Sequence, residues 1–244
     1  EAPWQARPSQ RQVLVVLGTE RGLCGKLNDL LATRADSWIR DRQQEGIEVR
    51  LVSLGRTTEK ALRRLRRQPL WSTSLPSRGL PPYDLAVRLS KDWLAEYESA
   101  AIGSLIVIHS TRRGLAGYST SVTTLLPPPL APLQEREDLT LPPILDGDIA
   151  ALASRTLALW LCAAFYGIML RSAVAEHTAR YQLLEGAAQN AHNLKDELAL
   201  QLQQERQEAI TSEMQDLMAG AGLVGSSTVT NSARSRQGRR ATLT

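Results

Sequence analysis

Cysteine and histidine are both scarce in this chain. Its 244 residues include two cysteines, Cys24 and Cys162, and three histidines. Two cysteines so far apart argue against a disulfide framework or a cysteine-rich zinc site, and they suit a reducing compartment. The histidines, at positions 109, 177 and 192, show neither metal-ligand spacing nor a Ser-His-Asp grouping. We therefore expect no metal site and no Ser-His-Asp catalytic site in this chain, and no cofactor.

Long apolar runs and a strong net charge are also absent. The longest apolar stretch, residues 157–170, is shorter than the roughly 20 residues that a membrane-spanning helix needs, so we interpret it as a buried helix segment. The chain has 29 basic and 25 acidic residues and a formal net charge of +4, which gives little reason to expect a nucleic-acid partner. A secretory signal is absent, and because the first residue is Glu1, we expect the sequence to begin part-way into a longer protein.

Proline is missing from residues 148–219, and this absence predicts one very long uninterrupted helix. Asp148 is suited to the N-cap, and Gly220 and Gly222 follow where a C-cap belongs. From Val174 onward the apolar residues narrow to a seam with intervals of three and four, which is typical of a helix packed along another helix. The seam consists of Tyr181, Leu184, Ala188, Ala191, Leu194, Leu198 and Leu202.

A seam of this kind needs a partner, because a solitary exposed helix is a poor fold. The chain offers no second helix of matching length. We therefore predict that the helix forms half of a coiled coil, either with another molecule or copy, or with a segment of its own chain that precedes Glu1.

The first half of the sequence alternates strand and helix patterns. Continuous apolar runs predict buried strands at 13–17 and 105–108, further strands are expected at 47–54 and 119–126, and helical periodicity covers roughly 27–45, 57–67 and 83–97. This alternation predicts an α/β fold, a mostly parallel, Rossmann-like sheet with helices on both faces. The expected domains are an extended lead-in at 1–11, the α/β domain at 12–127, a proline-rich linker at 128–147, the long helix at 148–224 and a disordered basic tail at 225–244.

A glycine-containing loop after the first strand, Gly18-Thr-Glu-Arg-Gly-Leu-Cys-Gly-Lys-Leu-Asn28, superficially suggests nucleotide binding. Both the phosphate-loop and the dinucleotide patterns require glycine where the chain has Glu20, and the phosphate loop also requires serine or threonine where it has Leu27. We therefore assign a structural role to the loop and to five of its residues: Gly18, Arg21, Gly22, Gly25 and Asn28.

Two polar groups remain as candidate sites. The basic run Arg63-Arg64-Leu65-Arg66-Arg67 reads as a solvated helix face. Arg206, Gln207, Thr211 and Glu213 lie where the seam loses its leucines, and Gln207 and Thr211 share one helix face. They are either a solvated helix end or hydrogen-bonding contacts to a partner.

The glycine-containing loop resembles a signature of the gamma subunit of F-type ATP synthases, the family pattern being S-D-R-G-L-C-G-G-L-N. A second match lies in the long helix, where Ala175-Glu-His-Thr-Ala-Arg180, Asn190-Ala-His-Asn-Leu and Arg206-Gln-Glu-Ala-Ile-Thr-Ser-Glu213 are similar to the family's final helix. The resemblance covers residues 13–223. The chain departs from the pattern at Lys26 and Ser212, and the family's N-terminal helix is not in the sequence.

The resemblance implies a non-catalytic rotor subunit of the central stalk, which couples proton or sodium flow through a membrane ring to ATP synthesis or hydrolysis in a catalytic head. It implies alpha, beta and epsilon subunits, the c-ring and an N-terminal helix of the same subunit as partners, and a location on the cytoplasmic face of a bacterial inner membrane. By analogy Arg206, Gln207, Thr211 and Glu213 are catch contacts to a catalytic subunit. Two alternatives remain open on residues alone: a nucleotide-binding α/β enzyme with a helical dimerisation arm, and a stand-alone coiled-coil adaptor.

Overall fold

The computed structural model describes residues 9–76, 79–114, 117–129 and 148–221. Most of the expected lead-in (1–11) and linker (128–147), and the whole of the expected tail (225–244), lie outside these residues. The chain forms two compact units, Glu1–Ala187 and Ala188–Thr244, which are described separately below.

The first unit is built around a five-stranded sheet in the order β3-β2-β1-β4-β5. All neighbouring strands are parallel except the edge strand β5, which is antiparallel to β4. The elements in chain order are β1 (Arg11–Leu17), α1 (Leu27–Gln44), β2 (Glu48–Leu54), α2 (Arg56–Arg64), β3 (Trp71–Thr73), α3 (Tyr83–Glu98), β4 (Ser104–Arg113), β5 (Gly117–Leu126) and α4 (Ile149–Gly220).

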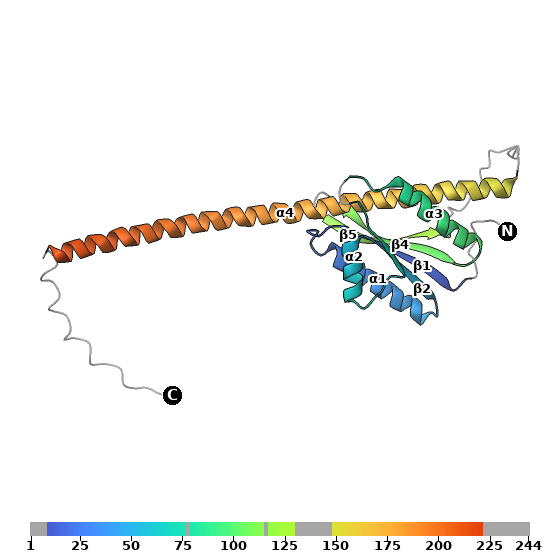
Figure 1. Cartoon of the computed structure of the whole chain (residues 1–244), viewed down its shortest axis with the longest axis horizontal. Helices are drawn as coiled ribbons and strands as arrows, with labels where there is room; N and C mark the ends of the chain where they lie inside the picture. Colours follow the sequence, from blue (N-terminus) through green and yellow to red (C-terminus); the bar gives the residue numbers. More distant parts are fainter. Residues whose placement is uncertain (1–8, 77–78, 115–116, 130–147, 222–244) are drawn as a thin grey trace, which may run out of the picture. The chain divides into compact units, whose positions relative to one another are not determined.

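Helices cover both faces of the sheet, which confirms the predicted fold class (Figure 1). The central strand β1 is apolar at consecutive positions because alternate side chains enter two cores. Val13, Val15 and Leu17 pack toward α3 and the first part of α4, while Leu14 and Val16 pack toward α1 and α2.

The start of α4 is a core element of the first unit. Phe165 is fully buried and meets Trp93 of α3 edge to face, with ring centroids 5.1 Å apart. Among the described helices, α4 alone is long and apolar enough to cross a membrane, but Leu161, Phe165 and Ile168 of that stretch pack against the sheet. The helix is therefore accounted for as a core helix of an α/β unit.

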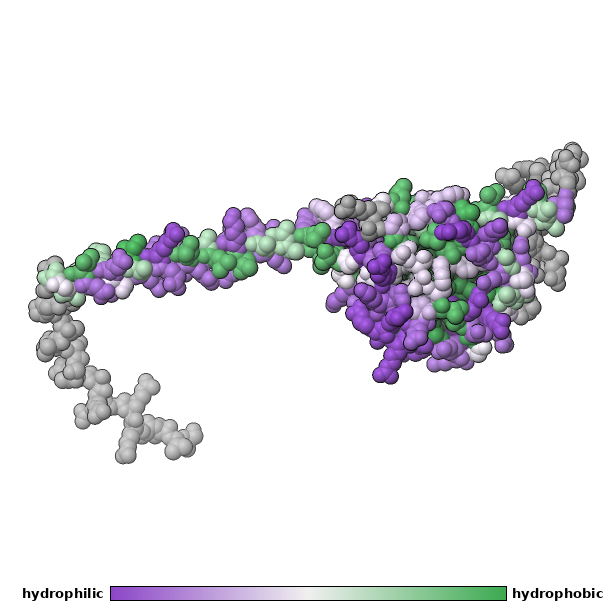
Figure 2. All heavy atoms as spheres, viewed as in Figure 1, coloured by the Kyte–Doolittle hydropathy of each residue, from purple (hydrophilic) through white to green (hydrophobic). Residues whose placement is uncertain are grey.

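The long helix itself is as predicted, because α4 runs unbroken from Ile149 to Gly220. Asp148 caps its start, since one carboxylate oxygen accepts a hydrogen bond from the Ala150 N–H at 2.9 Å. In the second unit, residues 188–220 are exposed throughout. Apolar residues alternate there with polar ones (Figure 2). The pairing of this stretch with another helix stays a prediction.

Three details of the sequence reading need correction. The segment 68–82, for which no strand or helix was predicted, contains the short strand β3, which pairs with Val52–Leu54 of β2. Helix α2 ends at Arg64 and not at Arg67, because Arg66 adopts a positive φ of 59°. The apolar stretch 157–170 is buried on one face only, since Leu159 on its other face is 73% exposed.

Candidate functional site

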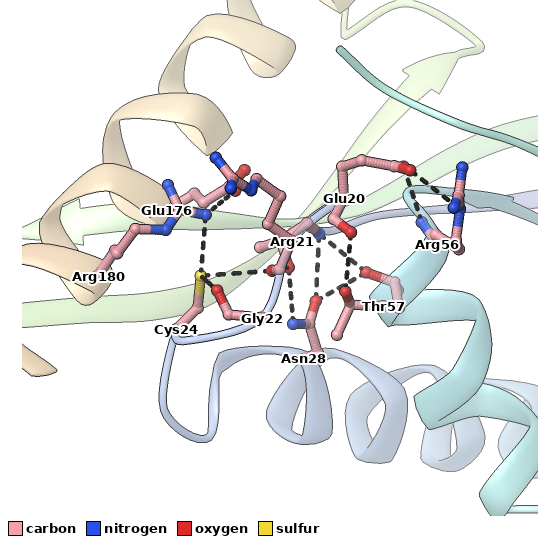
Figure 3. Close-up of polar contacts among 11 residues, drawn as sticks. Glu20, Arg21, Gly22, Cys24, Asn28, Arg56, Thr57, Glu176 and Arg180 are labelled. Carbon is pink, nitrogen blue, oxygen red and sulfur yellow. Dashed lines mark hydrogen bonds and ion pairs between the residues drawn. The ribbon is translucent and has the colours of Figure 1, made fainter. Parts of the chain in front are cut away.

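The loop between β1 and α1 is held by a buried network of hydrogen bonds (Figure 3). The Thr19 N–H donates to Asn28 Oδ1 at 3.1 Å and to Thr58 Oγ1 at 3.0 Å. Asn28 Nδ2 donates to Thr19 Oγ1 at 2.8 Å, and the Thr58 hydroxyl donates to Asn28 Oδ1 at 2.8 Å. The three side chains thus satisfy one another and fix the loop to the starts of α1 and α2.

Two glycines of the loop have a geometric reason to be glycine. A Cβ on Gly18 would lie 1.7 Å from Thr58 Oγ1, so only glycine fits beside the network. Gly25 has a φ of 57° and lies close to the Tyr118 hydroxyl. Gly22 has open space around it, and the neighbouring Leu23 takes a positive φ of 62° without being glycine.

Glu20 fills the position at the start of α2 that an anion would occupy. Its carboxylate accepts the backbone N–H of Arg56 at 3.1 Å and that of Leu75 at 3.0 Å, and it pairs with the Arg56 Nε at 3.1 Å. The side chain is only 10% exposed. A carboxylate here complements the positive end of the helix dipole, so Glu20 caps α2 from a distant loop.

The two segments that carry the family resemblance meet at Cys24 and Arg180. Arg180 Nη2 of α4 donates to Cys24 Sγ at 3.5 Å and to the Glu176 carboxylate at 2.5 Å (Figure 3). Burial raises the pKa of the Cys24 thiol, although the Arg180 charge opposes this shift. The thiol therefore stays protonated at neutral pH and donates toward the Arg21 and Gly22 carbonyls, so it is poorly suited to be a nucleophile.

Helix α4 also covers the carboxyl ends of β1 and β4, where the strand order of the sheet reverses. Doubly wound folds bind ligands at this point. Here the Ser110 hydroxyl at the end of β4 lies 3.1 Å from the Ser172 hydroxyl of α4. The cavity that remains beside Gly18, Met169 and Ser172 is about 30 Å³, room for water and far below the size of a nucleotide pocket.

This arrangement can anchor one helix to a sheet, but it leaves no place for a phosphate. The Thr19 N–H, which a phosphate loop would direct at its ligand, is already bonded, and a carboxylate occupies the start of α2. Among the described residues, no group of three or more His, Cys, Asp or Glu side chains could hold a metal ion. The geometry therefore opposes a nucleotide-binding enzyme.

The four candidate catch residues lie in the second unit, in the last turns of α4, and all are exposed. Gln207 and Thr211 are linked, because the Thr211 hydroxyl donates to the Gln207 carbonyl at 2.8 Å. Arg206 and Glu213 lie two turns apart on a different face of the helix, and neither side chain has a partner among the described residues.

Sequence reasoning overlooked part of the anchoring network. Glu176 was given no role of its own in the sequence analysis, yet its carboxylate accepts a hydrogen bond from Arg180 and holds it in place. Thr58 was not among the predicted site residues, although its hydroxyl oxygen accepts a hydrogen bond from the Thr19 N–H. For Glu176 the one available signal was its place in the second signature segment. Thr58 had no sequence signal, because side chains this far apart in sequence share no periodicity.

The comparisons with known proteins agree with the two-segment signature. A family model described as ATP synthase matches residues 1–223. The ATP synthase gamma chain of Syntrophobacter fumaroxidans is 28% identical over 213 residues, which cover 85% of this chain and 71% of the relative. That of Parabacteroides distasonis is 26% identical and covers 90% of this chain and 76% of the relative.

Solved structures show the same fold at lower identity. A chain from the Euglena gracilis mitochondrial ATP synthase, in a structure of OSCP, F1 and c-ring, matches 91% of this chain and 77% of its own length, with a TM-score of 0.60 and 14% identity. A chain from the Tetrahymena thermophila central stalk and c-ring matches 75% and 78%, with a TM-score of 0.57 and 16% identity. Because the family model spans nearly the whole sequence, the chain belongs to the ATP synthase gamma-chain family.

Proposed function

We propose that residues 188–220 of α4 transmit force by contact, with the leucine seam packed on an N-terminal helix of the same subunit and the late polar residues touching a catalytic subunit. The chain is a central-stalk rotor subunit of an F-type ATP synthase and is not catalytic alone, since catalysis belongs to the alpha and beta subunits.

The observation that carries the proposal is the exposure of a complete apolar seam. Leu194, Leu198 and Leu202 are each more than half exposed, and their spacing places them on one side of the helix. Burying a leucine stabilises a fold by about 1.5–3 kcal/mol, so a row of leucines left in water favours association with a second helix.

The polar residues beyond the seam suit a different kind of contact. Arg206 and Glu213 carry unneutralised charges, and Gln207 keeps its side-chain amide free to donate and accept. Such groups form strong, orientation-dependent hydrogen bonds when a partner surface comes near, and they lose them when it moves away. Contacts of this type would couple the angle of the rotor to the state of one catalytic subunit, because a contact that differs between two states shifts their equilibrium.

The relatives support further proposals on the partners and the location of this chain. The solved structures that this chain resembles come from assemblies with F1 and c-ring, which supports alpha, beta and c-ring partners. The curated relatives are bacterial, which supports a position on the cytoplasmic face of a bacterial inner membrane. We propose the epsilon subunit as a further rotor partner.

The catch role is tested in the assembled complex. Arg206→Ala and Gln207→Ala should each lower ATP turnover roughly tenfold, which corresponds to the loss of about 1.4 kcal/mol of contact free energy in the rate-limiting state. Gln203→Ala, an exposed glutamine one turn earlier, is the matched control and should leave turnover unchanged. Circular dichroism of the purified chain should be the same for all variants, because no described side chain depends on these groups. Full turnover in both catch variants would rule out this role.

A further inference from the structure

A large groove lies between α3 and the first part of α4 (Figure 1). Its volume is about 700 Å³, far more than that of the cavity beside Gly18. Its walls are mostly apolar, with Val87 and Leu94 on α3 and Leu159 and Tyr166 on α4. Leu159 is 73% exposed and Val87 is 40% exposed, so no described residue fills the groove. Soluble proteins rarely leave an apolar surface of this size open, and the groove therefore requires an occupant.

The α4 wall of the groove belongs to the same stripe of residues as the seam. Residues of this wall recur at intervals of three and four, and the same intervals continue along α4 until they reach the beginning of the seam. The stripe consists of Leu159, Cys162, Tyr166, Leu170, Ala173, His177, Tyr181 and Leu184. A helix that packs on the seam and follows α4 toward its start therefore enters the groove.

The connection to β1 indicates which helix this is. The Gly103 N–H, beyond the end of α3, donates to the Arg11 carbonyl at the start of β1 at 2.8 Å. The Ser154 hydroxyl, near the start of α4, donates to the Glu98 carboxylate at the end of α3 at 2.6 Å. The start of β1, the end of α3 and the start of α4 thus lie at the same end of the sheet. A helix antiparallel to α4 finishes at this end, where residues 1–10, which can span at most about 35 Å, lead into β1.

We propose that the groove between α3 and α4 holds the last turns of a helix of the same subunit, which precedes β1 and runs antiparallel to α4. The relatives leave room for such a segment, because the matched part covers 71% of one and 76% of another. The inference rests on the proposed function, which places this helix on the seam, and it adds α3 as a second contact surface. Lys91 lines the groove, is exposed and forms no salt bridge among the described residues. The fitting helix therefore has apolar residues toward both walls and an acidic residue opposite Lys91.

The thiol of Cys162 reports whether the groove is covered, because Cys162 lines it and the other cysteine, Cys24, is only 2% exposed. In the assembled complex, N-ethylmaleimide should modify Cys162 at least tenfold more slowly than in a complex that carries Leu159→Asp, since a buried charge expels the helix from the groove. Leu80→Asp makes the same change at a loop leucine of equal exposure, and should leave Cys162 protected. Equal rates in the parent and Leu159→Asp complexes would refute the proposal.

A photo-reactive residue in place of Val87 identifies the occupant in a complex that is otherwise unchanged. The expected product is a link within the same subunit, to the end of a segment that precedes Glu1. A link to another subunit or to a second copy of this chain, or no link in an active complex, overturns the proposal. The same residue in place of Leu198 tests the seam. A link upstream from position 198 but none from position 87 refutes the groove contact and leaves the proposed function standing, whereas no link from either position refutes both.

Discussion

At the scale of single residues, Gly18 shows how closely the loop is packed. The position is set by the Thr19, Asn28 and Thr58 network, and this network leaves no volume for a methyl group at residue 18. The phosphate-loop pattern does not predict this requirement for glycine at residue 18, because that pattern contains only the glycines that a bound phosphate needs. Here the close neighbour is a threonine of the chain itself.

Gly18→Ala should destabilise the first unit by at least about 2 kcal/mol, because a Cβ would force apart a buried network that has no room to yield. Gly22→Ala introduces the same methyl group into open space and should change stability by less than about 0.5 kcal/mol. Urea unfolding followed by tryptophan fluorescence measures both. If the two variants were equally stable, the contact with Thr58 would not restrict residue 18.

His109 should make the first unit sensitive to acid. Burial lowers the pKa of His109 below its usual 6.5, and the positive charge of Arg171 acts in the same direction, while the bond to the Ser110 carbonyl opposes it. The unfolded chain therefore binds a proton below pH 6.5 that the folded chain does not. Folding stability is thus fully present above pH 6.5 and falls as the pH drops toward the lowered value.

His109→Gln should flatten this dependence between pH 7 and pH 5.5, by no more than about 1.4 kcal/mol per pH unit, since one proton is involved. The readout is the urea midpoint at each pH. His177→Gln, an exposed histidine on α4, is the control and should keep the slope of the parent chain. An unchanged slope in the His109 variant would show that His109 is not the cause of the acid sensitivity.

At the scale of elements, α4 combines two patterns that the sequence distinguishes well. Its early turns have apolar residues on several sides, and one of these faces contacts the sheet core through Leu161 and Phe165. Its later turns keep apolar residues in a narrow row, as a helix does when a single partner covers it.

Leu198→Glu should abolish or strongly reduce entry of the chain into the complex, because it places a charge in the centre of the seam. Leu200→Glu makes the same change on the opposite side of the helix, at a leucine of similar exposure, and should have a much smaller effect. Co-purification with the head subunits is the measurement. Equal losses in both variants would show that the seam is not the face that binds.

The elements that sequence reasoning found are those with periodicity. Apolar runs located β1 and β4, and helical spacing located α1, α3 and α4. Strand β3 was missed because three residues between prolines carry no period, and its pairing depends on β2 holding it in place. The contact between Arg180 and Cys24 could not be predicted for a related reason, since it depends on where two distant elements meet.

At the scale of the whole molecule, the fold and its family were accessible from two signature segments and the order of elements between them. The edge position of β5 was not, because its sequence contains only uncharged residues, many of them small or β-branched, which describe a strand and give no sign of its place in the sheet. Only the strand order identifies it as an edge.

Because α4 covers the carboxyl ends of β1 and β4, the fold also limits how a small molecule could regulate this subunit. In the described part of the chain, the usual ligand crevice of this fold is filled by Ser172 and its neighbours on α4 and by the loop around Gly18. A nucleotide-sized metabolite has no room in the cavity of about 30 Å³ that remains there. This crevice therefore gives adenylate supply no direct access to the subunit.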